Sequence, residues 1–243
     1  MSYTRLPFNQ YYIDESNGYR NKNKRRFNIE FNHTEFEYKF LWKKVKCSAD
    51  WEIHYEADRN VIQINFEETN GNSDWFINFM FKEKMYDSFH ILWKGKKRKI
   101  TLKAARGWAK MYKSIKHDLK LKFRELWEQH QDAEVEICGW SLGSGQAQFC
   151  AQDLNWNFGV EPHVFTHGSV NPWRGFACRD YIRSLNKEAY NFKHRSDIVG
   201  YLPPFIGYFC INPVWIGKFS FKELFNPARW HTEYGEEYLY EKC

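Results

Sequence analysis

The stretch Gly139-Trp140-Ser141-Leu142-Gly143 has the form G-x-S-x-G and stands between a predicted strand and a predicted helix. Upstream, Val135-Glu136-Ile137-Cys138 alternates apolar and charged residues, as a strand does. Downstream, apolar residues recur at the spacing of one helix face: Ala147, Ala151 and Leu154. Strand, tight turn and helix are the setting of a nucleophile elbow, which presents a serine on a strained turn. We therefore predict that Ser141 is a nucleophile.

The two glycines of the pentapeptide have a physical reason in such an elbow. A Cβ atom at Gly139 or Gly143 would collide with the neighbouring strand or helix. Gly145, two residues further on, would let the helix pack closely behind the turn. An ordinary glycine-containing turn is the alternative until the rest of the chain is taken into account.

A serine hydroxyl is a weak nucleophile and needs a histidine as general base, which a carboxylate orients. In α/β-hydrolases these partners follow the serine in the order acid, then histidine. Asp197 follows a predicted strand and precedes the rigid pair Pro203-Pro204. His231 is the one histidine after Asp197. Read singly, Asp197 would be a turn or cap residue and His231 a surface residue, but together with the elbow they predict a triad.

Seven segments of the chain match, in the same order, the sequence motifs of one known family. They are Val61–Thr69, Asp74–Asn78, Arg106–Trp108, Ile137–Ala147, Phe165–Ser169, Asp197–Pro204 and His231–Tyr234. In this order they resemble the class 3 lipases, the fungal triacylglycerol lipase type. The elbow and the Asp197–Pro204 segment, close to Asp-x-Val-Pro-x-Leu-Pro-Pro, are the specific ones. The resemblance covers roughly 170 residues, from about Asn60 to His231.

The resemblance implies an α/β-hydrolase fold, with a mostly parallel central sheet flanked by helices and a β-rich N-terminal segment. It implies hydrolysis of carboxylic esters, most favourably lipid esters, through an acyl-enzyme. Ser141, Asp197 and His231 would be catalytic, and the Leu142 backbone N–H and Thr69 would form the oxyanion hole. A triad of this kind needs no metal or organic cofactor.

Three departures from the family pattern bear on activity. Trp140 replaces the histidine usual in the elbow, and Gly143-Ser144 replaces a glycine pair. Neither change alters a triad atom. Glu67-Glu68-Thr69 stands where the family has Arg-Gly-Thr. Two carboxylates near the oxyanion hole would disfavour a developing negative charge unless they point away from it.

Length and local patterns predict one domain over residues 1–243, because no linker or repeat divides the chain. Residues 1–60 are expected to extend the same sheet. Within this region, residues 51–55 and 61–66 are typical of a hairpin. A long amphipathic helix is expected from Trp108 to Leu126, and strands at 163–167 and 189–194.

Aromatic residues make up 19% of the chain, enough to fill a core and also to line an acyl pocket. A cluster follows the oxyanion position where the family has its mobile lid, and it includes Trp75, Phe76 and Phe79. We therefore expect residues 70–100 to form a lid. Phe205 follows the acid in a segment too rich in Pro and Gly for a long helix, and it is a second candidate for the acyl pocket.

The 36 basic and 30 acidic residues leave a modest excess of +6, with basic runs at 21–26 and 94–99. No nucleic-acid-binding motif accompanies these runs, so we expect no nucleic-acid partner. A solvated loop is the usual explanation, and peripheral attraction to anionic lipid headgroups is the alternative. His163 and His167 are four residues apart without a third ligand, so a metal site is not expected.

No secretion signal is recognised at the start of the sequence, and its six cysteines form no C-x-x-C pair. A cytoplasmic protein with reduced thiols is the default expectation, and signal-independent release stays open. Lipid class, acyl-chain length and oligomeric state are undetermined.

Two other functions stay open. The same triad could serve acyl transfer or thioester cleavage, and the altered oxyanion strand would suit a non-catalytic binding member of the fold. The geometry of His231 separates this last alternative from catalysis. Thirty-four positions and four prolines separate His231 from Asp197. We expect His231 on a loop before a final helix or turn that begins near Thr232, with Nδ1 toward Asp197 and Nε2 toward Ser141.

Overall fold

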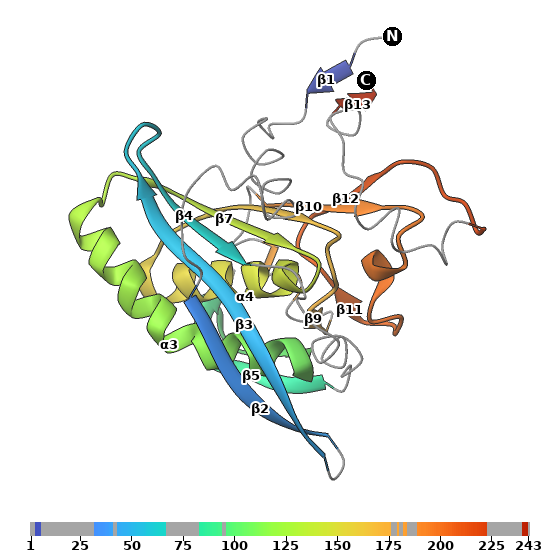
Figure 1. Ribbon diagram of the computed structural model, residues 1–243, viewed down its shortest axis with the longest axis horizontal. Helices are drawn as coiled ribbons and strands as arrows, with labels where there is room; N and C mark the ends of the chain where they lie inside the picture. Colours follow the sequence, from blue (N-terminus) through green and yellow to red (C-terminus); the bar gives the residue numbers. More distant parts are fainter. Residues whose placement is uncertain are drawn as a thin grey trace.

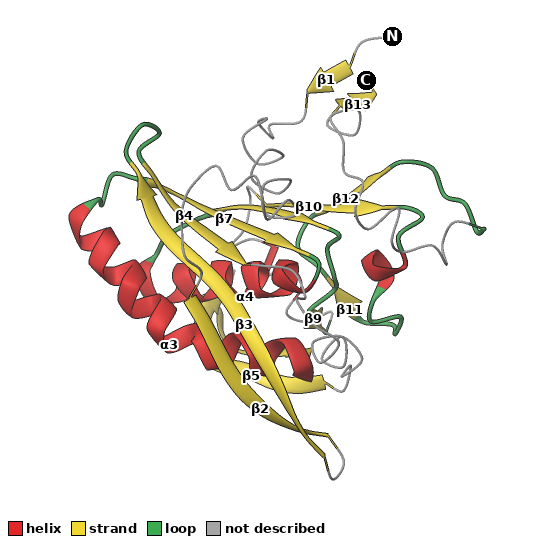
Figure 2. Ribbon diagram, viewed as in Figure 1, coloured by secondary structure: helices red, strands yellow, loops and turns green. Residues whose placement is uncertain are grey.

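The computed structural model describes residues 3–5, 32–40, 43–66, 83–93, 96–175, 179, 182–183, 189–222 and 240–242. Its framework is a seven-stranded sheet with two long helices on one face (Figures 1 and 2). In spatial order the strands are β12 (Pro213–Ile216), β10 (Ala189–His194), β8 (His163–His167), β7 (Glu134–Trp140), β4 (Val61–Phe66), β3 (Lys43–Glu56) and β2 (Asn32–Phe40).

Five neighbouring strands of this sheet are parallel, from β12 to β4, and β3 and β2 are antiparallel at one edge. The mostly parallel α/β architecture expected from the sequence is therefore confirmed. The predicted hairpin is also present, since Glu56 pairs with Val61 across a four-residue turn that ends at Asn60 with a φ of 52°. Parallel strands present their carboxyl ends at one edge of a sheet, where ligands bind in open α/β folds.

Both helices pack on one face of the sheet because their apolar residues recur at helical spacing. The first, α3 (Arg106–Gln129), is the long amphipathic helix predicted from the sequence. The second, α4 (Leu142–Phe158), is buried over most of its length. Alternate strand residues enter the core with them, namely Ile62, Ile64, Phe66, Val135, Ile137 and Val164. The other face of the sheet carries a smaller cluster: Cys138, Trp140, Phe165, Phe192 and Ile216.

A second, four-stranded antiparallel sheet has the order β11 (Tyr208–Phe209), β9 (Trp173–Arg174), β6 (Lys96–Ala105) and β5 (Glu83–Trp93). It is attached to α4 by aromatic contacts. The Tyr86 ring stacks on Phe149 at 4.9 Å between centroids and meets Trp173 edge-on at 5.2 Å. The expected lid over residues 70–100 stays a prediction, and residues 70–82 lie outside the described ranges.

The two ends of the chain lie side by side, where β1 (Tyr3–Arg5) pairs antiparallel with β13 (Tyr240–Lys242) (Figure 1). Among the helices that the structure describes, none combines the length and hydropathy that a membrane span needs. The single-domain organisation stays a prediction.

The core contribution of α3 can be measured with two leucines of the same helix. Leu119 is fully buried between helix and sheet, whereas Leu121 is 44% exposed. We expect Leu119→Ala to lower the free energy of unfolding by about 3 kcal/mol, because the buried side chain leaves a cavity. Leu121→Ala should change it by less than about 0.5 kcal/mol. Urea unfolding followed by circular dichroism makes the measurement, and equal effects would contradict this packing.

Candidate active site

Ser141 occupies the sharp turn between β7 and α4. Its backbone has a φ of 52° and a ψ of −116°, a combination that non-glycine residues rarely adopt. Its residue surface is 6% exposed. Such strain persists only where the surrounding structure over-determines it, and it concentrates at functional sites. The geometry is that of a serine presented on a strand-to-helix turn, as the sequence predicts.

Glycine at position 139 is required by the close approach of strand and helix. A Cβ atom on Gly139 would lie 2.4 Å from the carbonyl oxygen of Gly143, which is backbone and has little freedom to move. A Cβ atom on Gly145 would lie 3.3 Å from a methyl carbon of Val170, a tight but softer contact. The collision expected at Gly139 is confirmed, and the contact at Gly145 agrees with the close helix packing expected there. The expectation for Gly143 stays a prediction.

Hydrogen bonds connect the elbow to the last residue of β8 and to the segment that follows it. The Ser141 N–H donates to the carbonyl of His167 at 2.9 Å. The Ser144 hydroxyl donates to the Ser141 carbonyl at 2.5 Å and accepts the Val170 N–H at 3.0 Å. Sequence reasoning recorded Ser144 only as a departure from a glycine pair. A serine three residues after the start of a helix turn commonly bonds back to the backbone, and this signal could have identified its role.

Trp140, which replaces the usual elbow histidine, belongs to an aromatic stack on the outer face of the sheet. Its ring stacks on His167 with centroids 5.1 Å apart, and His167 stacks on Phe192 at 5.4 Å. The stack joins three adjacent parallel strands, β7, β8 and β10, just below the edge where Ser141 lies. The substitution therefore contributes to packing next to the elbow.

Leu142 is the first residue of α4 and is 2% exposed. The first backbone N–H groups of a helix have no acceptor within the helix, and the helix dipole makes this end favourable for negative charge. The Leu142 N–H is thus suited to the oxyanion role predicted for it. Thr69, the second predicted oxyanion residue, lies outside the described residues, as do Glu67 and Glu68.

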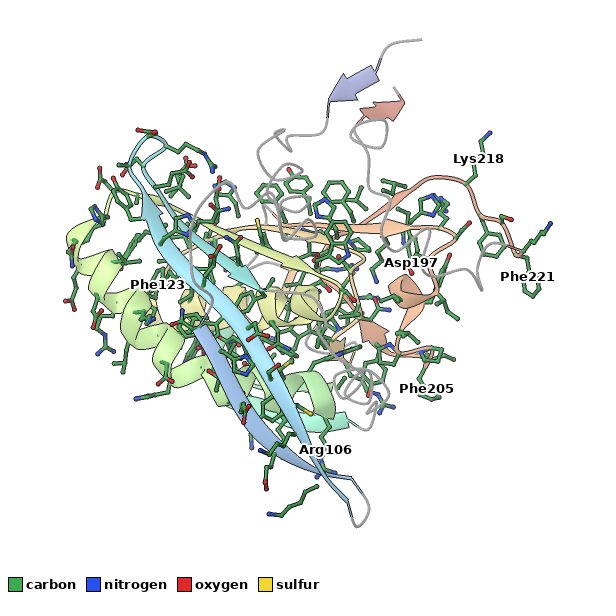
Figure 3. The ribbon with its side chains drawn as sticks, in the orientation of Figure 1. Arg106, Phe123, Asp197, Phe205, Lys218 and Phe221 are labelled. Carbon is green, nitrogen blue, oxygen red and sulfur yellow. The ribbon has the colours of Figure 1, made fainter. Side chains whose placement is uncertain are left out.

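Asp197 is fully buried just beyond the carboxyl end of β10 (Figure 3). One carboxylate oxygen accepts the Val199 N–H at 2.9 Å, so Asp197 caps the short 3-10 helix η1 (Ile198–Tyr201). Its own N–H donates to the His194 carbonyl at 3.0 Å. This places a buried carboxylate directly after a strand end, as expected from the sequence.

Ser141 and Asp197 lie at the same edge of the sheet, because β8 is hydrogen-bonded to both β7 and β10. The end of β8 and the segment after it connect the two sides. The His167 carbonyl accepts from Ser141, and the Ser169 N–H donates to the Phe192 carbonyl at 3.1 Å. His231 lies outside the described residues, so closure of the triad stays a prediction. The same holds for the predicted lid residues Trp75, Phe76 and Phe79.

Phe205, the other candidate for the acyl pocket, lies on the loop between η1 and β11. It is 56% exposed, and its neighbour Ile206 is 88% exposed. Figure 3 shows Phe205 at the end of the molecule that carries Asp197, far from Phe123 on α3. A role in substrate binding stays a prediction for this residue.

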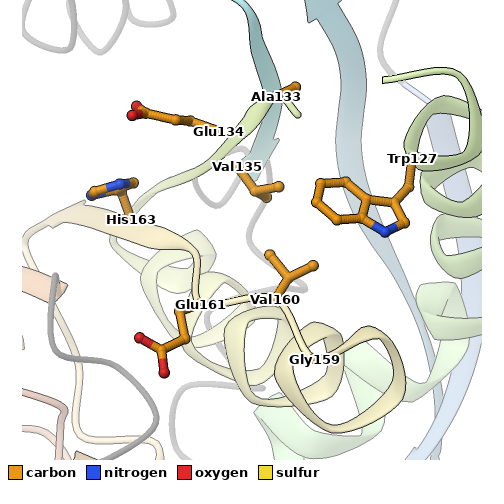
Figure 4. A pocket seen from close by; sticks show the side chains of 8 residues that line it. All are labelled: Trp127, Ala133, Glu134, Val135, Gly159, Val160, Glu161 and His163. Carbon is orange, nitrogen blue, oxygen red and sulfur yellow. The ribbon is translucent and has the colours of Figure 1, made fainter. Parts of the chain in front are cut away.

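A hollow of about 430 Å³ lies at the opposite end of the strands (Figure 4). Trp127 stands on one side of it, and Glu134, Glu161 and His163 on the other. Glu134 begins β7, and Ser141 follows its last residue. At about 3.3 Å per residue, the hollow is therefore about 20 Å from the nucleophile and does not belong to the triad's site.

Sequence reasoning missed a buried amine next to the acid. Lys193 is 1% exposed, and its Nζ donates to the Gly200 carbonyl at 2.7 Å and to Asn171 Oδ1 at 2.6 Å. Burial lowers the pKa of Lys193. In the sequence, Lys193 follows Phe192 in an alternating run and is indistinguishable from a solvated strand residue.

Comparison with known proteins supports this geometry. The family model "Lipase (class 3)" matches residues 63–206, which is more than half of the chain. No curated protein matches. Several solved structures match the chain. Native Rhizomucor miehei lipase in a propeptide complex is 18% identical, with a TM-score of 0.63 and coverage of 86% of this chain and 67% of that one.

Two further structures have the same fold. A deletion mutant of the Rhizomucor miehei lipase propeptide complex is 19% identical, with a TM-score of 0.61, and 78% of this chain matches 55% of that one. A triacylglycerol lipase is 18% identical, with a TM-score of 0.56 and coverage of 77% and 67%. The chain thus spans between about half and two thirds of the length of these lipases.

At these identities the structures establish the fold, and the family model establishes the family. With a strained serine between β7 and α4 and a buried aspartate after β10, the chain belongs to the class 3 lipase family, a family of carboxylic ester hydrolases with the α/β-hydrolase fold.

Proposed function

We propose that this protein is a serine hydrolase that cleaves lipid esters through an acyl-enzyme formed on Ser141. The observation that carries the proposal is the backbone of Ser141, held at a φ of 52° between a parallel strand and a helix. Asp197 at the same sheet edge supplies a buried carboxylate in the expected order. The catalytic centre of one triacylglycerol lipase with this fold is formed by a serine protease triad.

Each residue has a defined step in this mechanism. His231 takes the proton from Ser141 Oγ as the hydroxyl attacks the acyl carbon, and then gives it to the departing alcohol. Asp197 holds the imidazole in the required tautomer and stabilises its positive charge. The Leu142 N–H, at the start of α4, and Thr69 stabilise the oxyanion. Water, activated by the same histidine, then releases the fatty acid.

A catalytic role is preferred over the non-catalytic alternative on a physical ground. A non-catalytic member would have no use for the strain at Ser141, which costs about 1–3 kcal/mol. Acyl transfer and thioester cleavage would use the same atoms, and they differ only in what is admitted to the acyl-enzyme. No described residue favours either of them over hydrolysis.

The nucleophile can be identified by covalent labelling. We expect a fluorophosphonate probe to label the native protein and to leave Ser141→Ala unlabelled, because the elbow presents only this hydroxyl. Ser114→Ala is the matched control, since that serine lies in the middle of α3 and donates to the Met111 carbonyl. Labelling is read by intact mass and peptide mapping. Undiminished labelling of Ser141→Ala would exclude the proposed nucleophile.

The acid can be tested without changing side-chain size. Asp197→Asn should keep the fold and lower kcat by about 10⁴-fold, because the amide no longer selects the correct imidazole tautomer. Turnover of p-nitrophenyl butyrate and near-UV circular dichroism together make the measurement. A folded variant with native turnover would show that Asp197 is not the acid.

The expected lid predicts a response to a lipid surface. If residues 70–100 cover Ser141, activity on dispersed lipid should rise more than activity on a short soluble ester when a micellar surface is supplied. Tributyrin hydrolysis is measured across its solubility limit, with p-nitrophenyl acetate as the soluble control. A linear tributyrin profile, with no change at the interface, would indicate an open esterase site.

A further inference from the structure

Lys193 brings an amine into the interior beside the turn that carries Asp197. It lies on β10, four residues before the acid, and is 1% exposed. A lysine is almost never fully buried unless its ammonium is compensated by acceptors or by an opposite charge. The surroundings of Lys193 supply both.

Three acceptors surround the ammonium group. Nζ donates to the Gly200 carbonyl at 2.7 Å and to Asn171 Oδ1 at 2.6 Å, and it shares a hydrogen bond with the Cys210 side chain. It also lies 5.5 Å from the ring centroid of Trp215, a favourable position for a cation. An ammonium group has three donors, and this arrangement satisfies each of them.

Two of these acceptors belong to the segments that fix the acid. Gly200 is in η1, the turn that Asp197 caps. Asn171 comes from the segment after β8, and its N–H donates to the Leu202 carbonyl at 2.8 Å. Asn171 Nδ2 donates to the Gly200 carbonyl at 3.4 Å. Lys193 therefore joins β10, the acid's turn and the segment that holds Ser141.

Charge also connects Lys193 to the acid. Burial lowers the pKa of Lys193, while the Cys210 thiol and the Asp197 carboxylate act in the opposite direction. Burial raises the pKa of Cys210, and Lys193 and Arg183 oppose this rise. Arg195 and Asp197 both act on the pKa of Tyr201, whose rise has burial as its main cause. Asp197 is the carboxylate among the groups that act on these pKa values.

We propose that Lys193 is a positioning residue for the triad, which clamps the Asp197 turn to the sheet edge and supplies a buried positive charge near the Asp197 carboxylate. This inference rests on the proposed function, since it assigns a second role only if Asp197 is the acid. It predicts two separable effects, one on turnover and one on the pH dependence of turnover.

Loss of the hydrogen bonds that Lys193 makes to Gly200 and Asn171 is expected to lower kcat. Without the ammonium, the Gly200 carbonyl and Asn171 Oδ1 lose a shared donor, and the turn can shift relative to β10. A displacement of about 1 Å at a catalytic group can cost up to about 10²-fold in rate. Loss of the charge is expected to shift the pH profile of turnover in one direction. A nearby cation disfavours a second positive charge on the proposed catalytic histidine, so its removal is expected to move the acid limb of the pH profile upward.

Two variants separate these effects. Lys193→Met removes donors and charge, whereas Lys193→Gln keeps an N–H donor and removes only the charge. We expect kcat for p-nitrophenyl butyrate to fall about 10- to 100-fold in Lys193→Met and less in Lys193→Gln. In both, the acid limb of kcat/KM should move up by about one pH unit. Lys218→Met is the control, because it removes an exposed cation from a neighbouring loop and should leave both values unchanged.

Folding of each variant is checked by near-UV circular dichroism and by fluorophosphonate labelling of Ser141. If Lys193→Met does not fold, Lys193→Gln tests the charge and Asn171→Ala tests the clamp. Asn171→Ala should lower kcat several-fold with an unmoved acid limb. Native kcat and an unmoved acid limb in folded Lys193 variants would overturn the inference. The proposed function would survive that result, whereas native protein without Ser141-dependent esterase activity would overturn the function itself.

Discussion

The contact between the backbones of Gly139 and Gly143 is the constraint on which the site depends. A Cβ atom at position 139 would lie 2.4 Å from the Gly143 oxygen, so β7 and α4 reach their observed separation only with glycine there. This separation forces the chain to reverse within one residue, and Ser141 absorbs the reversal with a positive φ. The position of the nucleophile at the sheet edge and that of the Leu142 N–H both follow from this close approach.

The end of β8 and the short segment after it connect this constraint to the acid. On one side, the His167 carbonyl accepts from Ser141, and Val170 donates to the Ser144 hydroxyl. On the other side, Asn171 is bonded to the turn of Asp197. One short connection thus holds both reacting groups, although 56 positions separate them in the sequence. A rigid element of this kind maintains catalytic geometry better than two independent loops would.

Two polar side chains in the interior around the site, Gln148 and Lys193, are hydrogen-bonded to neighbouring segments. Gln148 donates to the Ser144 carbonyl and accepts the Ile211 N–H at 3.0 Å. Lys193 extends this network to the acid's turn. Burial of such groups costs free energy, and each bond recovers only part of it, so a network of this type specifies a geometry more than it stabilises a fold. A fixed geometry of this kind is needed at the sheet edge that carries Ser141 and Asp197.

The local sequence by itself determined the elements and the elbow, because strand alternation, helical spacing and glycine are properties of neighbouring residues. The hairpin of β3 and β4, the long helix α3 and the strand before Ser141 all follow from such patterns. The order of serine, aspartate and histidine is likewise legible in the chain. The role of Ser144 and the burial of Lys193 were decided only by the tertiary structure. A lysine in an alternating run becomes a clamp only when Gly200 and Asn171, brought from other segments, surround its ammonium and exclude water from it.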